Sequence, residues 1–465
     1  MAGSSSSPVA RAVGWLPVPT WRLGAAAVVL APVAAVLPTG LWTALALVNG
    51  VLLAAAVVDA ALAPAVRTLT VERDMPAALT LDGQATVRWY VANPARRRLR
   101  VRLADQMAPS LRADDRRARL VVPPGGRATA STRIHPSRRG RFALAGVTVR
   151  VEGPVGLAAR QDDVAVPGAI RVLPRFRSRE EAELRVERAQ VLQAGLRLAQ
   201  GHGGGTEFDR LREYELDDEF RHIDWRATAR AGKPIVRTYR AERNQTVLAL
   251  LDCGRTMAGQ VALEGGRARA GYADETWTVP RLDHGMDAVL ALTVVATGLG
   301  DATGLVAFAD NVRAVVPPRG RPGQLSRVSE ALTPLEPVLA ESDYRRAFAE
   351  TLTRFRRRAL LVVITELSPE PISETLLPAL PLVLRDHLVV VAGLRDPEVD
   401  RWAHGTPEDA DAAYRKAAAL AALDGRARAA ARLRGLGATV IDEVPARLPG
   451  ALADAYLDVK STGRL

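Results

Sequence analysis

The spacing of apolar and polar residues changes along the chain, and each change predicts a different kind of structure. Residues 21–66 are almost uninterrupted apolar sequence, residues 67–174 alternate with a period of two, and residues 246–465 combine apolar runs with helical spacing. A period of two is typical of half-buried strands, and a period near 3.6 is typical of helices. A chain of 465 residues also exceeds one ordinary core. We therefore expect several domains.

The apolar N-terminal stretch predicts a transmembrane hairpin. No charged residue lies between Arg22 and Asp59, and crossing the hydrocarbon takes about 20 apolar residues. The turn Leu37-Pro38-Thr39-Gly40-Leu41 divides the stretch, because Pro and Gly break helices. We expect two transmembrane helices within residues 21–66, with Asp59 at the membrane interface.

Arginines flank this hairpin on both sides and none lies in its turn; they are Arg11 and Arg22 before it, and Arg67 and Arg73 after it. Basic flanks stay in the cytoplasm. We therefore expect a cytoplasmic tail at residues 1–20 and an integral membrane protein with its bulk in the cytoplasm. The alternative is a cleaved secretory signal, but a signal's apolar region is short and this one continues.

Residues 67–174 predict a β-sandwich. Ala85–Val91, Leu99–Leu103 and Val147–Val151 each alternate apolar and polar residues, and Pro- or Gly-containing turns separate them. Short strands at this spacing, without helical patterns between them, are typical of a small sandwich.

Composition excludes some functions. The net charge is +12, but Lys233, Lys416 and Lys460 are the only lysines, so arginine carries nearly all of it. That bias is typical of a GC-rich genome, and the remaining charge suits an anionic membrane surface. Nucleic-acid binding ranks last, because the basic residues are spread out with no aromatic platform between them. The single cysteine, Cys253, cannot form an intramolecular disulfide and fits a reducing compartment.

A connector and a dense polar segment follow the predicted sandwich. Residues 175–205 are charged and Leu-rich with helical spacing, and they end in a glycine-rich run. Residues 206–245, which we call the cassette, contain Glu213, Tyr214, Arg221, His222, Asp224, Trp225, Arg226 and Thr228.

The cassette allows two interpretations. Its acid–base groups, Glu207, Asp209, Glu213, His222 and Asp224, could build a hydrolytic site. They could instead pair with arginines in a structural network, with Trp225 as an anchor into a core or an interface; those arginines are Arg210, Arg212, Arg221, Arg226 and Arg230. Structural ion pairs are the more common use of such residues, so we favour the network.

Residues 246–465 predict a doubly wound α/β domain. Val247–Leu251, Leu360–Ile364 and Leu388–Ala392 are apolar runs typical of parallel strands covered on both faces, and Gly304–Phe308 begins a hairpin. Helical patterns lie between them. The ligand crevice of such a sheet lies at the carboxyl ends of its strands.

Polar groups follow the predicted strands at that edge. Asp252 and Thr256 follow the first strand, Ser342 lies in a loop in the middle of the domain, and Thr365 and Glu366 follow the third strand. Hard oxygen ligands from three loops are what a Mg²⁺ site requires.

The cassette resembles the signature of a bacterial family classed as a domain of unknown function, number fifty-eight. The residues that carry this resemblance are Glu213-Tyr214 and the run Arg221-His222-Ile223-Asp224-Trp225-Arg226-Ala227-Thr228-Ala229. The resemblance implies a membrane hairpin, a β-sandwich and a von Willebrand factor A-like domain. It also implies an association with a MoxR-type AAA+ ATPase, because many members are encoded beside one.

The resemblance further implies a metal motif, Asp-x-Ser-x-Ser with a Thr and an Asp from two other loops. This sequence offers Asp252, Gly254, Thr256, Ser342 and Glu366 at those positions. Gly254 has no hydroxyl and removes one ligand. The site is therefore degenerate, and Mg²⁺ is the one cofactor to which it points; otherwise these residues shape a loop surface.

These observations favour a membrane-anchored, non-enzymatic adaptor. Its strand-end loops, around Asp252, Ser342 and Glu366, would bind a protein partner, the AAA+ ATPase or its client. No catalytic residue is expected. The alternative is a metal-dependent hydrolase that uses the cassette, but no nucleophile, base and orienting group stand at a defined spacing.

Overall fold

The computed structural model describes residues 17–36, 40–81, 83–199, 207–215, 218, 220–240, 245–262 and 278–462. These divide into two compact units, residues 1–173 and 174–465. Most of the predicted tail, the centre of the hairpin turn, the glycine-rich run and Asp217 lie outside the described residues.

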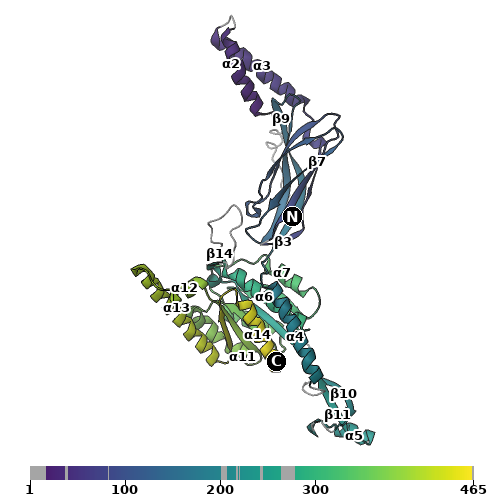
Figure 1. Ribbon diagram of the computed structural model, residues 1–465, viewed down its shortest axis with the longest axis vertical. Helices are drawn as coiled ribbons and strands as arrows, with labels where there is room; N and C mark the ends of the chain where they lie inside the picture. Colours follow the sequence, from purple (N-terminus) through teal and green to yellow (C-terminus); the bar gives the residue numbers. More distant parts are fainter. Residues whose placement is uncertain are drawn as a thin grey trace. The chain divides into compact units, whose positions relative to one another are not determined.

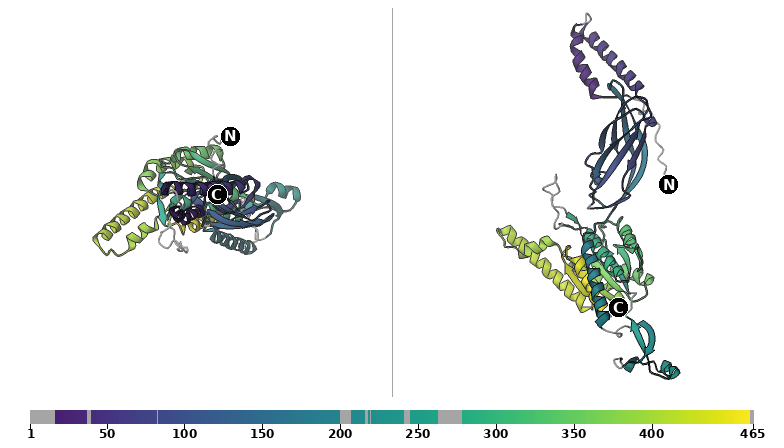
Figure 2. Two further views of the ribbon diagram at one scale, coloured as in Figure 1. Left: turned by 90° about the horizontal axis from the view of Figure 1, so that it is seen from above. Right: turned by 45° about the vertical axis from the view of Figure 1, so that its right-hand side comes forward.

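Two apolar helices lie side by side near the N-terminus, α2 (Trp21–Val36) and α3 (Leu41–Leu62) (Figures 1 and 2). The segment Trp42–Thr68, which includes α3, is long and apolar enough to cross a membrane. With its 16 residues, α2 spans about 24 Å, less than the hydrocarbon thickness of about 30 Å. Two helices were predicted here, and one has the length to cross a membrane.

Two sheets form the sandwich of the first unit. The larger has the strand order β1-β9-β8-β5-β6, with β3 pairing with β9, and the smaller has the order β2-β4-β7. Their elements are β1 (Val18–Pro19), η1 (Val66–Thr68), β2 (Thr70–Asp74), β3 (Ala78–Thr80), β4 (Ala85–Ala92), β5 (Leu99–Asp105), η2 (Pro109–Leu111), β6 (Arg117–Val122), β7 (Arg127–Ile134), β8 (Gly140–Glu152) and β9 (Ala158–Leu173). The inward residues of both sheets share one apolar core, as the period of two predicted.

A buried ion pair lies within this core. Asp105 accepts hydrogen bonds from Nε and Nη2 of Arg73, both at 2.9 Å, and from Nε1 of Trp89 at 2.6 Å. The Arg73 and Asp105 side chains are 1% and 0% exposed. Burial raises the pKa of Asp105, and the hydrogen bond from Trp89 and the charge of Arg73 oppose that rise. Arg73 is therefore a core residue, and counting it among the basic flanks of the membrane hairpin was wrong.

The second helix is fastened to the turn between β8 and β9. Asp59, 2% exposed, accepts hydrogen bonds from the backbone N–H groups of Val155, Leu157 and Ala158 at 2.8, 2.7 and 3.1 Å. A side chain at Gly153 would collide with this carboxylate. We expected Asp59 at the membrane interface, but its carboxylate is buried against the sandwich and serves as the acceptor for this turn.

The second unit contains a six-stranded sheet with the order β16-β15-β12-β17-β18-β19, parallel except for the edge strand β16. Its strands are β12 (Thr246–Asp252), β15 (Ala302–Phe308), β16 (Val312–Arg319), β17 (Leu360–Thr365), β18 (Leu388–Leu394) and β19 (Thr439–Glu443). The order corresponds to 3-2-1-4-5-6, which is common in doubly wound sheets.

Helices cover both faces of this sheet (Figure 1). They and the remaining turns are α4 (Arg179–Ala199), η4 (Arg255–Ala258), α6 (Arg281–Gly298), α7 (Gln324–Leu332), α8 (Tyr344–Arg354), α9 (Pro369–Pro371), η5 (Ile372–Leu376), α10 (Leu377–Ala379), α11 (Pro381–Leu384), α12 (Pro397–His404), α13 (Ala410–Gly435) and α14 (Leu448–Ser461). In β12, Val247 and Leu251 face the helices α6, α7 and α14, whereas Leu248 and Leu250 face α8 and α13. This two-sided burial explains the continuous apolar run.

Two short hairpins complete the unit. The cassette contains β10 (Glu207–Glu213), η3 (Phe220–His222), α5 (Trp225–Ala231) and β11 (Ile235–Arg240), and the other hairpin is β13 (Gln260–Ala262) with β14 (Thr278–Pro280). The helix predicted in the connector is α4. It packs on α6, where a side chain at Gly298 would collide with Val186.

Candidate functional site

The strand ends that carry the predicted ligands meet at the point where the sheet order reverses. The chain runs from β12 outward to β15 and β16, and then returns to β17 on the other side of β12. Ligands of doubly wound sheets bind at such a reversal, beyond the carboxyl ends of the strands. Asp252 ends β12 and Thr365 ends β17, so both lie at this position.

Asp252 is the centre of a buried hydrogen-bond cluster, which we call the strand-end cluster. One carboxylate oxygen accepts from the backbone N–H of Gly254 at 2.8 Å and from the hydroxyl of Ser342 at 2.5 Å. The other accepts from the hydroxyls of Tyr344 at 2.9 Å and Thr365 at 2.6 Å. Asp252 is 0% exposed. A carboxylate offers about four lone-pair positions, so protein donors occupy all of them.

Tyr344 is the member of this cluster that sequence reasoning missed. It begins α8, and Phe308 contacts its ring edge-on at 5.4 Å between ring centroids. Burial, followed by the negative charge of Asp252, raises the pKa of Tyr344 well above its usual value. The phenol therefore stays protonated and keeps donating. The only sequence signal was its position, two residues after Ser342.

Gly254 explains why the middle serine of the metal motif is absent. A Cβ atom there would collide with the Ser342 hydroxyl and would lie 3.0 Å from the carbonyl oxygen of Ala340. The loop that contains Ser342 therefore packs directly on the Gly254 backbone. A serine at this position would have to push that loop away from Asp252.

Glu366 belongs to a second, separate set of charges. Its carboxylate forms ion pairs with Arg281, at 3.3 Å, and with Arg426. Arg426 also pairs with Asp442 at 2.6 Å. Burial raises the pKa of Glu366, and the charges of Arg426 and Arg281 oppose that rise.

The predicted metal ligands do not fit a Mg²⁺ site as the structure places them. Asp252 and Ser342 touch, but Glu366 is paired with two arginines and the backbone carbonyl of Thr256 accepts from Arg281 at 3.2 Å. A cation at Asp252 would have to displace one of its four proton donors, and Mg²⁺ demands near-octahedral oxygen geometry. Among the described residues, no group of three or more His, Cys, Asp and Glu side chains is arranged to hold a metal ion.

An exposed rim lies above the strand-end cluster, formed by Arg255, Leu339 and Glu341. Leu339 is 82% exposed. The Arg255 and Glu341 side chains pair at 2.5 Å and are 59% and 55% exposed. The Arg255 N–H donates to the carbonyl of Ala340 at 2.9 Å, so the two loops are joined. The rim therefore presents one large apolar side chain beside an ion pair.

The cassette charges form a local network, in which Glu213 and Asp224 pair with basic residues other than the predicted arginines. Glu213 pairs with Lys233, and Asp224 pairs with Arg237 at 2.7 Å. Asp224 also caps α5, accepting from the backbone N–H groups of Arg226 and Ala227 at 3.0 and 3.1 Å. The hydrogen bond from Ala227 and then that from Arg237 lower the pKa of Asp224. Arg212 pairs with Asp218 at 2.5 Å.

The remaining signature residues are mostly structural as well. Thr228 accepts from the N–H of Ile235 at 3.0 Å, and the N–H of Tyr214 donates to the carbonyl of Pro234 at 3.0 Å. His222 lies in η3, and Arg226 is exposed and donates its N–H to the cap. The Arg221 side chain lies outside the described part of the chain.

Trp225 was expected to anchor a core or an interface. It is 62% exposed, and its ring meets that of Phe220, 69% exposed, edge-on at 5.7 Å. Trp225 is therefore not a core residue. Its helix ends at Gly232, whose φ of +67° is the left-handed conformation that glycine adopts most easily.

Comparison with known proteins gives one family match. The family described as "Protein of unknown function DUF58" matches residues 210–401, which include the cassette and the strand-end cluster. No curated protein matches the sequence significantly.

Several solved structures are similar to parts of the chain. The conserved hypothetical protein BatB from Bacteroides thetaiotaomicron is 14% identical, covers 47% of this chain and 99% of its own, and has a TM-score of 0.30. An uncharacterised membrane spanning protein from Vibrio fischeri is 14% identical, covers 47% of this chain and 98% of its own, and has a TM-score of 0.17. The seventh PapD-like domain of human CEP192 is 10% identical, covers 22% of this chain and 84% of its own, and has a TM-score of 0.18.

Proposed function

We propose that this protein is a membrane-anchored, non-enzymatic adaptor that binds a protein partner at the strand ends of a von Willebrand factor A-like domain. The partner we propose is a MoxR-type AAA+ ATPase or its client. The family match over residues 210–401 supports this proposal, because the resemblance to that family is the source of both the domain type and the partner.

The domain assignment is supported by strand order. The sheet order corresponds to 3-2-1-4-5-6, its edge strand β16 is antiparallel, and an aspartate ends its first strand. The resemblance implies a metal motif at that aspartate. Here Tyr344 and Thr365 donate to Asp252 instead, so we propose that the domain binds its partner without a bound ion.

The membrane anchor rests on the segment Trp42–Thr68. We propose that it lies in the bacterial plasma membrane and that the rest of the chain faces the cytoplasm. Arg67 is 83% exposed at the side chain and supports this orientation. The single cysteine, Cys253, is buried and reduced, which suits a cytoplasmic location.

The observation that carries the adaptor proposal is the rim. The polar groups at the strand ends form hydrogen bonds and ion pairs within the protein, whereas the Leu339 side chain beside them is 82% exposed. Large apolar side chains at the centre of an interface contribute most of its binding free energy. Asp252, Ser342 and Glu366 are buried, so their part would be to hold the loops in place rather than to touch the partner.

The test is a crosslinking pull-down from native bacterial membranes, using the full-length chain. Wild-type protein should capture an AAA+ ATPase, identified by mass spectrometry. Leu339→Ser should reduce that capture about tenfold, because a buried apolar anchor is worth more than about 1.4 kcal/mol.

The matched control is Leu420→Ser on α13, where Leu420 is 49% exposed. This variant should capture the partner as well as wild type does. Equal capture by Leu339→Ser and wild type, from protein with an unchanged melting temperature, would remove the rim from the proposal.

The alternative is a metal-dependent hydrolase that uses Glu213, His222 and Asp224. Asp224 caps α5 and pairs with Arg237, and Glu213 pairs with Lys233, so two of the three groups already have structural partners. Phosphoester or peptide hydrolysis by the purified chain, lost in His222→Ala, would establish the alternative instead.

A further inference from the structure

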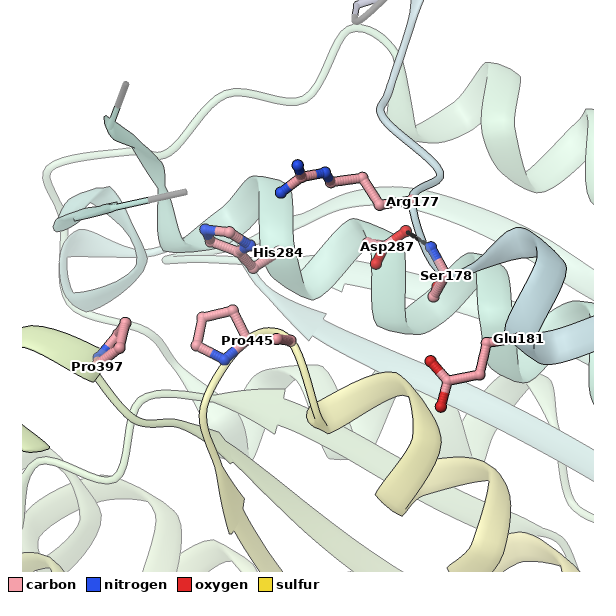
Figure 3. Close-up of a pocket in the computed structure, with 8 residues that line it drawn as sticks. Arg177, Ser178, Glu181, His284, Asp287, Pro397 and Pro445 are labelled. Carbon is pink, nitrogen blue, oxygen red and sulfur yellow. Dashed lines mark hydrogen bonds between the residues drawn. The ribbon is translucent and has the colours of Figure 1, made fainter. Parts of the chain in front are cut away.

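A small cavity of the α/β unit lies apart from the strand-end cluster. Its volume is about 240 Å³, and it is lined by Arg177, Ser178, Glu181, His284, Asp287, Pro397, Pro445 and Ala446 (Figure 3). These residues come from the start of α4, the first turns of α6, the start of α12 and the loop between β19 and α14. Drug-sized ligands occupy pockets of about 300–1,000 Å³, so this cavity suits a smaller molecule.

His284 gives the cavity an unused hydrogen-bonding atom. Its Nε2 is buried and has no partner among the described residues, while the ring makes a hydrogen bond to the backbone of Val261. Burial and then the positive charges of Arg175, Arg177 and Arg281 lower the pKa of His284 to about 4. The ring is therefore neutral at neutral pH. With its other nitrogen donating to Val261, Nε2 is an acceptor.

The same wall of the cavity is positively charged. Figure 3 shows the Arg177 side chain beside the His284 ring. A guanidinium has five N–H donors in a planar fork, so it can bind an oxyanion while it keeps other contacts.

The two acidic residues of the lining already have partners in the protein. Asp287 accepts from the backbone N–H of Ser178 at 3.3 Å; burial raises its pKa, and the hydrogen bonds from Ser178 and Arg177 and the charge of Arg177 oppose that rise. Glu181 pairs with Arg185, whose guanidinium also reaches Asp454 at 3.0 Å. Both carboxylates can still accept a hydrogen bond from a ligand that carries its own proton.

We propose that this cavity binds a small oxyanion that carries a proton, of which hydrogen phosphate is the simplest. Arg177 would donate to the charged oxygens, and Nε2 of His284 would accept from the ligand's hydroxyl. Pro397 and Pro445 also line the cavity. Sulfate, which has the same shape and no proton at neutral pH, could use Arg177 but would place an oxygen lone pair against that of Nε2.

The test measures binding of inorganic phosphate and sulfate to the full-length chain in detergent micelles by titration calorimetry at neutral pH. Phosphate should bind and should be favoured over sulfate about tenfold, since an unpaired buried acceptor costs about 1–3 kcal/mol. Arg177→Gln should weaken phosphate binding about tenfold or more. His284→Phe should remove the preference for phosphate over sulfate.

The matched control is Arg188→Gln, an exposed arginine on the same helix as Glu181, and it should bind phosphate as wild type does. ¹⁵N-histidine NMR of the wild-type chain provides a measurement without substitution, because the Nε2 resonance of His284 should move on addition of phosphate and not of sulfate.

Two outcomes would overturn the proposal. One is no phosphate binding by wild type through millimolar concentrations, and the other is equal affinity for phosphate and sulfate. A second titration with glycerol 3-phosphate identifies the source of the ligand. Tighter binding than inorganic phosphate indicates a phosphate monoester, and weaker binding indicates the free ion.

Discussion

Two buried aspartates, one in each unit, are stabilised by different partners. In the sandwich, Asp105 is neutralised by the guanidinium of Arg73 and receives a hydrogen bond from Trp89. In the α/β unit, Asp252 receives one backbone and three hydroxyl hydrogen bonds, and no charged side chain among the described residues pairs with it. An ion pair balances the charge that burial penalises, whereas hydroxyls only solvate it.

The different partners of the two aspartates indicate which of them lies at a possible binding site. The Arg73–Asp105 pair is complete in itself and joins strands of two sheets. The hydroxyl shell of Asp252 holds together three loops at the edge where doubly wound sheets bind ligands. The sandwich therefore uses its buried charge for packing, and the α/β unit uses its own to shape a surface.

The largest expected effect is at Asp105. Asp105→Ala would leave the Arg73 side chain, 1% exposed, charged and unpaired, so we expect it to lower the free energy of unfolding by about 3–5 kcal/mol. Urea unfolding of the full-length chain in detergent would measure this loss. The double variant Arg73→Met with Asp105→Leu should recover most of it, because it removes both charges. A loss below about 1 kcal/mol for Asp105→Ala would mean that the pair is solvated.

The next effect is a pH dependence from His284 in the α/β unit. Its pKa is lowered from 6.5 to about 4, so between these values the unfolded chain binds a proton that the folded chain does not. Stability should therefore fall by about 3 kcal/mol as the pH drops through that window. Thermal unfolding of wild type and His284→Phe at several pH values measures the difference between them. Parallel profiles would show that the pKa of His284 is the same in the folded and unfolded chains.

A smaller effect is expected at Tyr344. Tyr344→Phe removes one hydroxyl donor to Asp252 without changing the ring, and a hydrogen bond to a charged group contributes about 1.5–3 kcal/mol. Equilibrium unfolding should show a loss in this range. The matched control is Tyr414→Phe. Tyr414 is 78% exposed, so this substitution should leave the free energy of unfolding unchanged. An unchanged free energy of unfolding for Tyr344→Phe would indicate that a water molecule replaces the phenol hydroxyl.

The smallest effect is expected at Asp162, a half-buried aspartate of the same unit whose partner is exposed. Its pair with Arg67 spans 3.1 Å, and the Arg67 side chain is 83% exposed. Asp162→Ala should change the free energy of unfolding by less than about 1 kcal/mol, because water screens the pair. A larger change in the free energy of unfolding, measured by urea unfolding, would show that burial does not explain the difference in stability between the two ion pairs.

Most of the fold could be predicted from the sequence, because burial leaves a period in the residue pattern. The two-sided apolar run of β12 and the alternation in β4 correspond to their observed burial. One of the helical patterns that separate the predicted strands corresponds to α8, Tyr344–Arg354. The edge strand β19 was missed, because its residues are half-buried and the run Thr439–Glu443 has no apolar period.

The candidate site could be predicted only in part. The sequence identified Asp252 and Ser342 because strand ends attract polar residues. It could not show that Tyr344 reaches the same carboxylate, since that contact depends on how α8 packs against the sheet. Glu366 was placed with Asp252 because it follows the neighbouring strand, but successive residues of a strand point to opposite faces. Thr365 therefore faces Asp252, and Glu366 faces Arg281 and Arg426.

The hydrogen bonds between Asp59 and the turn after β8 have a mechanical consequence. They fix α3 directly to the sandwich, so that a force applied to the sandwich is transmitted to the helix. In the membrane arrangement that we propose, the depth of α3 in the bilayer would therefore be set by how closely the sandwich can approach the lipid headgroups.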